Sequence, residues 1–108
     1  MQEAIFLEKQ RSAVREGRIE WQRHCLERML ERGLSRSEIV HVLLQGERIE
    51  DYPSDRPLPS GLFFGHSGSR ALHVVVAFDV STEKAFIITA YEPNLEQFQP
   101  DLRTRRKK

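Results

Sequence analysis

Two groups of residues in this chain have the side chains needed for phosphate and acid–base chemistry. The first comprises His24, Arg28 and Arg32, which recur every four residues. At about 100° per residue, a helix places these three side chains in one stripe along the border of its apolar face. Such a stripe can bind a phosphodiester and stabilise the charge of its transition state. The alternative is that these residues have a structural role only. In that case the arginines cover the rim of the core and pair with nearby acidic residues, and His24 is simply a surface residue.

The second group is His73 and Tyr91. His73 lies at the start of a predicted central strand, and Tyr91 lies at the end of the next strand. An antiparallel pair joined by a turn near Ser81 brings both positions to the same end of the sheet. In a metal-independent ribonuclease, His and Tyr can supply the base for the 2′ hydroxyl and the acid for the leaving oxygen, while arginines stabilise the phosphorane. The alternative is that His73 makes a local hydrogen bond and Tyr91 is a core aromatic with its hydroxyl at the surface.

Other kinds of site are not indicated. None of the four histidines forms a helical i, i+4 pair, and the sequence contains no C-x-x-C. It also has no G-x-S-x-G elbow and no glycine-rich phosphate loop, and its single cysteine, Cys25, falls on a predicted buried helix face. We therefore expect neither a metal nor a cofactor.

Three helices are predicted in the first half of the chain. The first spans about residues 3–16 and ends at Gly17, and a short link over residues 18–20 follows. The second helix ends at Gly33, and the third runs from an S-x-x-E capping box, Ser35 and Glu38, to Gly46. The buried face of the second helix is predicted to comprise Trp21, Cys25, Leu26, Met29 and Leu30.

Four strands are predicted in the second half of the chain. A short strand with Ile49 and Tyr52 precedes a proline-rich loop, and further strands follow at residues 61–66, 71–79 and 84–91. The run from Val74 to Phe78 is almost entirely apolar, which indicates a central strand covered on both faces. The predicted fold is α+β, with N-terminal helices packed on a four-stranded antiparallel sheet.

The length of 108 residues suits one domain, which we expect over residues 1–98. Residues 99–108 form a basic tail that includes Arg103, Arg105 and Arg106. This tail can contact a polyanion such as RNA, or it can be a solvated, frayed terminus. No apolar run approaches the length of a membrane span, and residues after Met1 do not resemble a signal peptide. With a lone cysteine as well, the expected location is the cytoplasm.

Several blocks of this sequence resemble a widespread prokaryotic family catalogued as a domain of unknown function. The similarity spans roughly Arg18 to Phe98. Its most specific parts have the patterns H-x-x-x-R-M-x-x-R-G-[IL]-S, which matches His24 to Ser35, and I-T-A-Y-E-P, which matches Ile88 to Pro93. The recurrent polar positions of the family correspond here to His24, Arg28, Arg32, His73 and Tyr91.

The resemblance implies a RelE-like fold, related to RelE-like and BrnT-like toxins. It also implies that the chain is the toxin of a type II toxin–antitoxin system and a metal-independent endoribonuclease acting on RNA. A zinc-finger antitoxin of the MqsA type is then the expected protein partner, and a second copy of the chain is another candidate partner. On this hypothesis His24, Arg28, His73 and Tyr91 are catalytic, while Arg32, Arg103, Arg105 and Arg106 bind RNA. The alternative hypothesis is a non-catalytic module that binds a protein or RNA through the same edge.

Overall fold

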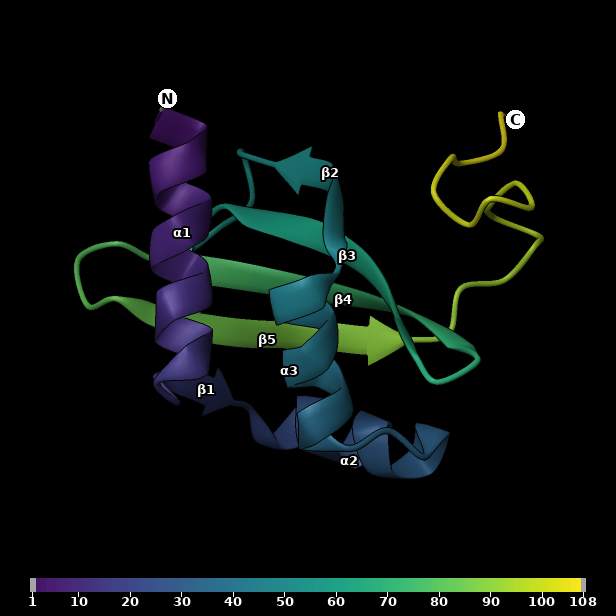
Figure 1. Cartoon of the computed structure of the whole chain (residues 1–108), viewed down its shortest axis with the longest axis horizontal. Coiled ribbons are helices and arrows are strands. Elements are labelled where there is room, and N and C mark those ends of the chain that lie inside the picture. Colours follow the sequence, from purple (N-terminus) through teal and green to yellow (C-terminus); the bar gives the residue numbers. More distant parts are fainter. Residues whose placement is uncertain (1, 108) are drawn as a thin grey trace.

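The computed structural model describes residues 2–107, with side chains from Ile5 onward. Its elements follow one another as three helices and five strands, with the first strand inserted between the first two helices (Figure 1). The helices are α1 (Gln2–Arg15), α2 (Arg23–Arg32) and α3 (Arg36–Gln45). The strands are β1 (Ile19–Trp21), β2 (Glu47–Tyr52), β3 (Ser60–Ser67), β4 (Arg70–Asp79) and β5 (Lys84–Tyr91). The predicted α+β class is confirmed. No helix among the described residues is long and apolar enough to span a membrane.

The helix ends lie where the local sequence predicts them. α1 stops just before Gly17, and α2 stops at Gly33, which takes the left-handed conformation with φ of 68°. Leu34 then donates its N–H to the carbonyl of Met29 at 2.8 Å and becomes buried, as expected after a glycine stop. α3 begins with the capping box, in which Ser35 and Glu38 each bond the backbone of the other.

The sheet differs from the predicted four antiparallel strands, because it has five strands and is mixed. The strand order is β1-β5-β4-β3-β2, and β1 pairs in parallel with β5 over Ile19 to Trp21. The link that was expected over residues 18–20 is therefore mostly a strand, and Trp21 belongs to it rather than to the second helix. A strand of only three residues has too few positions to show an alternating pattern, which explains why the sequence did not predict it.

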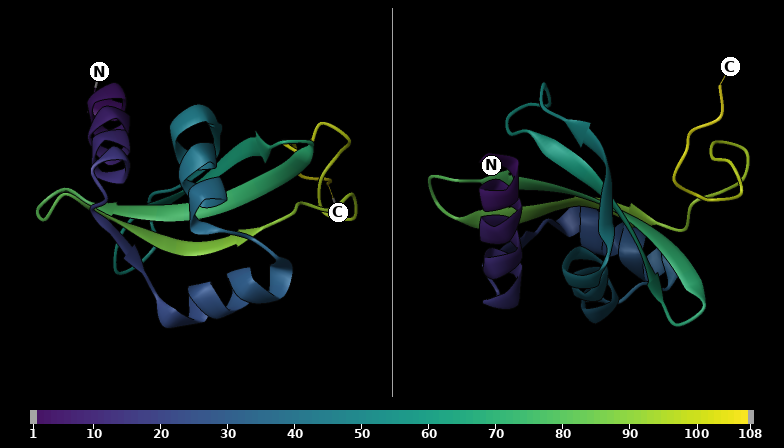
Figure 2. Two further views of the ribbon diagram at one scale, coloured as in Figure 1. Left: turned by 60° about the horizontal axis from the view of Figure 1, so that its bottom comes forward. Right: turned by 45° about the horizontal axis from the view of Figure 1, so that its top comes forward.

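One face of the sheet is covered by helices. The main core joins α1, α2 and α3 to the side chains of β3, β4 and β5 that alternate toward them, among them Val74, Ile87 and Ala90. Figure 2 shows α2 running beside β5, while α1 and α3 lie across the same face of the sheet. Cys25 and Met29 are buried as predicted, but Leu30 is 82% exposed, so its predicted burial is wrong. The reason is that α2 packs through a narrow stripe, and Leu30 lies outside it.

One end of the opposite face of the sheet is covered by the C-terminal segment, which we define as residues 92–107. This segment folds back beside the end of β5 and the start of β4 (Figures 1 and 2). Phe98 is 1% exposed, and its backbone pairs with Arg105 in an antiparallel bridge. β4 is central in the strand order, and residues on both of its faces are buried, as predicted.

Candidate functional site

His73 lies at the centre of a small second core between the sheet and the C-terminal segment. Its side chain is fully enclosed, and both ring nitrogens have partners. Nε2 lies 2.7 Å from the carbonyl oxygen of Leu102, and Nδ1 lies 3.4 Å from the hydroxyl of Tyr91. Because a carbonyl can only accept, Nε2 carries the hydrogen and, in the neutral ring, Nδ1 accepts from the Tyr91 hydroxyl.

Aromatic rings surround this histidine. Phe98, Tyr91 and Phe64 all meet it edge-on, with ring centroids at 4.6 Å, 5.4 Å and 5.7 Å from its own. Burial lowers the pKa of His73, because an imidazolium ion loses its hydration in this enclosed space. The ring is therefore neutral at physiological pH, and its Nδ1 can accept a hydrogen bond from the Tyr91 hydroxyl.

A carboxylate, a second tyrosine and a guanidinium extend the site toward solvent. The Nε of Arg105 donates to Glu50 at 2.8 Å, and the Tyr52 hydroxyl donates to the other oxygen of the same carboxylate. Burial raises the pKa of Glu50, but the hydrogen bonds from Arg105 and Tyr52 outweigh it, so that the net pKa is lowered. We call His73, Tyr91, Glu50, Tyr52 and Arg105 the polar cluster.

Protonation states in the polar cluster are set by burial and by these contacts. Burial raises the pKa of both Tyr91 and Tyr52, and the Glu50 carboxylate raises that of Tyr52 further. The cluster therefore holds an ionised carboxylate, two protonated phenols, a neutral imidazole and a guanidinium at neutral pH. Glu50 is 20% exposed and Arg105 is 50% exposed, so this end of the cluster is open to a ligand.

Two shifts of strand register bring these residues to one face. On β5 the register against β4 shifts by one residue at Ile88, so that Tyr91 pairs with His73 while Ile87 still faces the helices. On β2 the register against β3 shifts at Ile49, and Glu50 pairs with Leu62 instead of Gly61. Each shift leaves one residue unpaired, as in a β-bulge, and turns the following side chains to the other face. Glu50 and Tyr52 therefore point to the side of the sheet on which His73 lies.

Of the residues singled out in the sequence, the structure brings His73 and Tyr91 together and places Arg32 next to them. Arg32 Nη1 donates to the carbonyl of Ala90 at 2.8 Å and lies 3.4 Å from the hydroxyl of Thr89. Its charge also favours ionisation of Tyr91. The stripe along α2 thus ends at the edge of β5, beside Tyr91.

His24 and Arg28 do not join the polar cluster. Both are exposed on α2, which packs on the helix-covered face of the sheet, whereas His73 points to the other face. The guanidinium of Arg28 pairs with Glu31 at 2.9 Å within the helix. The four residues that the sequence suggested as catalytic therefore do not line a single concavity.

The three arginines near the C-terminus all make contacts within the chain, rather than lying in a free tail. Arg103 pairs with Glu47 at 2.6 Å and lies over the ring of Phe64, with its guanidinium carbon 5.1 Å from the centroid. Arg105 belongs to the polar cluster, and Arg106 Nε donates to the carbonyl of Leu95 at 2.6 Å. These three arginines are thus held by contacts within the chain, although their side chains stay at the surface.

Sequence reasoning missed Glu50 and Tyr52. Their spacing of two in a predicted strand places both side chains on one face, which was a usable signal for the pair. Nothing in the pattern indicated that this face meets His73, because the shift at Ile49 decides it.

Among the side chains of residues 5–107, no three from His, Cys, Asp or Glu gather in a way that could hold a metal ion. Searches of curated proteins and of solved structures find no match for this chain. A family model described as Domain of unknown function (DUF4258) matches residues 21–92, which covers Tyr91 and His73 but stops short of most of the C-terminal segment. Because this match spans more than half of the 108 residues, the chain belongs to the DUF4258 family of domains of unknown function.

Proposed function

We propose that this chain is a metal-independent endoribonuclease and the toxin of a type II toxin–antitoxin pair. The observation that carries the proposal is the polar cluster, which combines an ionised carboxylate, a phenol and a guanidinium at a partly open site. These are a base, an acid and a cation, the three groups that RNA cleavage needs in the absence of a metal ion.

The proposed reaction uses the adjacent 2′ hydroxyl of RNA as the nucleophile. Glu50 removes its proton, and the 2′ oxygen attacks phosphorus while the bond to the 5′ oxygen breaks. The Tyr91 hydroxyl turns from Nδ1 of His73 toward the RNA and protonates the leaving 5′ oxygen, and Arg105 stabilises the charge on the phosphorane. The products are a 2′,3′-cyclic phosphate and a 5′ hydroxyl. Glu50 then releases its proton to water and Tyr91 regains one, which restores the starting state.

His73 acts in this scheme as a positioning residue. It is enclosed and cannot touch RNA, but its Nδ1 accepts from Tyr91 and its Nε2 is fixed by Leu102. These two bonds hold the phenol at the edge of the second core.

The remaining cations are assigned to RNA binding. His24, Arg28 and Arg32 form an exposed stripe on α2 that leads to the edge of β5 beside Tyr91. Arg103 and Arg106 lie on the C-terminal segment next to Arg105. Their present contacts are at the surface, where ion pairs are worth less than about 1 kcal/mol, so RNA phosphates can replace them.

The proposed toxin function also implies a relationship to known toxin folds and a protein partner. It rests on the resemblance to RelE-like and BrnT-like toxins and on the arrangement of helices on one face of a mostly antiparallel sheet. The partner we propose is a zinc-finger antitoxin of the MqsA type. Leu30, which is 82% exposed on α2, offers it an apolar anchor beside the cationic stripe.

The proposal is tested by expressing the chain in bacteria and by incubating the purified protein with RNA. We expect growth arrest and RNA cleavage. Tyr91→Phe keeps the packed ring and removes the acid, so cleavage should fall by about 100-fold or more. Arg105→Gln should also lose most activity, while Arg15→Gln, a matched change on α1, should not. Equal activity in folded Tyr91→Phe and wild-type protein would overturn the assignment.

A second function, a non-catalytic binding module, is favoured by one observation. His73 is enclosed, and both of its nitrogens are satisfied within the chain, which is typical of a histidine that stabilises a fold. On this alternative, purified protein cleaves no RNA but binds a protein or RNA through the α2 stripe, and Arg28→Ala with Arg32→Ala abolishes that binding.

A further inference from the structure

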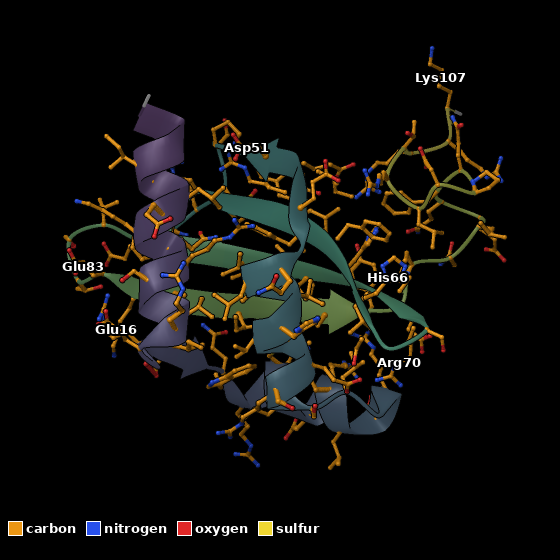
Figure 3. All side chains as sticks on the ribbon, viewed as in Figure 1. Glu16, Asp51, His66, Arg70, Glu83 and Lys107 are labelled. Carbon is orange, nitrogen blue, oxygen red and sulfur yellow. The ribbon has the colours of Figure 1, made fainter. Side chains whose placement is uncertain are left out.

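A cavity of about 250 Å³ opens on the helix-covered face of the sheet, away from the polar cluster. It lies between α1 and the strands β2 and β3, and its walls are largely apolar, with Phe6, Phe63 and two prolines, Pro53 and Pro59. Gly61 contributes only backbone, and a methyl group at this position would lie 3.2 Å from the Arg48 side chain. Figure 3 shows Asp51 on β2, at the side of the sheet that approaches α1.

The amide of Gln10 is the unusual group in this cavity. Its residue is only 4% exposed, yet within residues 5–107 its side chain makes no hydrogen bond. No polar side-chain atom in this part of the chain is both fully enclosed and unpaired. The residual exposure of Gln10 therefore belongs to its amide, which faces the cavity that the residue lines. Because this amide has no partner within the described side chains, a ligand in the cavity can form hydrogen bonds with it.

Two charged residues complete the lining. Arg48 and Asp51 both line the cavity, and neither forms an ion pair with another side chain within residues 5–107. Both belong to β2, on the face opposite to Glu50, because they pair with Phe63 and Gly61 of β3. The cavity thus offers apolar walls with an aromatic component, an amide with a donor and an acceptor, a cation and an anion.

We infer that this cavity binds a single unstacked nucleobase. Bases held outside a helix are recognised by aromatic or apolar walls and by hydrogen bonds to their edges, for which Gln, Arg and Asp are the usual side chains. A purely apolar ligand would leave the Gln10 amide without a hydrogen-bond partner. A simple anion would leave the apolar walls exposed to water and would be repelled by Asp51. A base satisfies the amide and fills the walls together.

This inference rests on the proposed function in taking RNA as the ligand. β2 is the edge strand of the sheet, with Arg48 and Asp51 on one side and Glu50 and Tyr52 on the other. RNA that crosses this edge can place one base in the cavity and a phosphate at Arg105. The base in the cavity would then determine where the RNA is cut.

Nucleotide binding can be measured without any cleavage. We would titrate the ¹⁵N-labelled chain with each of the four ribonucleoside 5′-monophosphates and with ribose 5-phosphate, which lacks the base. We expect saturable shifts at the Gln10 side-chain amide and at the Gly61 backbone for at least one nucleotide, and none there for ribose 5-phosphate.

Variants locate the site. Gln10→Leu should weaken the binding at least tenfold, whereas Gln45→Leu, at an exposed position on α3, should leave it unchanged. Asp51→Asn changes an exposed residue, so it keeps the fold intact, and should alter the preference among the four bases. No shift at the cavity with any nucleotide, equal shifts with ribose 5-phosphate, or full binding by folded Gln10→Leu would overturn the inference. Binding at the cavity by a protein that cleaves no RNA would contradict only the ribonuclease proposal.

Discussion

Acid should destabilise this protein through His73. Burial lowers the pKa of His73 in the folded chain below its ordinary value of about 6.5. Between these two pKa values the unfolded chain binds one more proton than the folded chain, so the free energy of unfolding falls as pH falls. The fall has an upper limit of about 1.4 kcal/mol per pH unit below about 6.5, and His73 contributes no dependence above that pH.

The surroundings of the His73 ring are consistent with a lowered pKa. The rings of Phe98, Phe64 and Tyr91 enclose it, and of the nearby charges Glu50 favours the imidazolium while Arg105 opposes it. Protonation would also give Nδ1 a hydrogen, and the Tyr91 hydroxyl that now donates to it would have to rotate.

Urea unfolding at about pH 7.5 and about pH 5.5 measures the effect. His73→Gln keeps an amide that can donate to Leu102 and removes the titrating group, so its stability should depend less on pH than that of the wild type. His24→Gln, at an exposed site on α2, should behave like the wild type. An identical pH dependence in wild type and His73→Gln would refute the reasoning. If His73→Gln does not fold, an NMR titration of His73 in the wild type replaces it, and a pKa at or above about 6.5 would refute the reasoning equally.

Three further changes test the packing. Phe98→Ala removes a ring that is 1% exposed and should cost about 3–5 kcal/mol, lost first as local opening of the C-terminal segment. Hydrogen exchange should then quicken at the amide of Arg106, and unchanged exchange there would contradict the packed segment. Ser35→Ala breaks the capping box and should lower the free energy of unfolding by about 1 kcal/mol, whereas Ser37→Ala should not. Gly33→Ala places a β-carbon on a residue with φ of 68° and should cost about 1 kcal/mol in urea unfolding, and no loss would contradict the left-handed helix end.

Local signals in the sequence predicted most elements correctly. Gly33 and the Ser35–Glu38 box act on their own helix ends, so their effects are readable without knowledge of the fold. The pairing of His73 with Tyr91 was also accessible, because one turn near Ser81 sets the register of β4 and β5 to within a residue.

Features that depend on distant parts of the chain were not predictable. β1 exists because its three residues pair with β5, more than sixty positions along the chain. Leu30 has the spacing of a core residue, but α2 packs on the sheet through a narrow stripe that does not include it, so it remains exposed.

The candidate site depends most on such long-range effects. Glu50 faces His73 only because the register of β2 shifts at Ile49, and a shift of one residue leaves no mark on composition or periodicity. Arg105 belongs to a basic stretch whose sequence is typical of a solvated terminus. Its place over Phe98, at 4.7 Å from the ring centroid, follows from the burial of Phe98 against His73.

The chemistry of the cut ends shows whether the polar cluster cleaves RNA without a metal ion. Purified wild-type protein would be incubated with a defined single-stranded RNA in excess EDTA, alongside Glu50→Gln and Tyr91→Phe. We expect cleavage in EDTA that leaves 2′,3′-cyclic phosphate and 5′-hydroxyl ends, and a loss of activity of about 100-fold or more in each variant. Cleavage that stops in EDTA, ends of the opposite kind, or undiminished cutting by both folded variants would contradict this expectation.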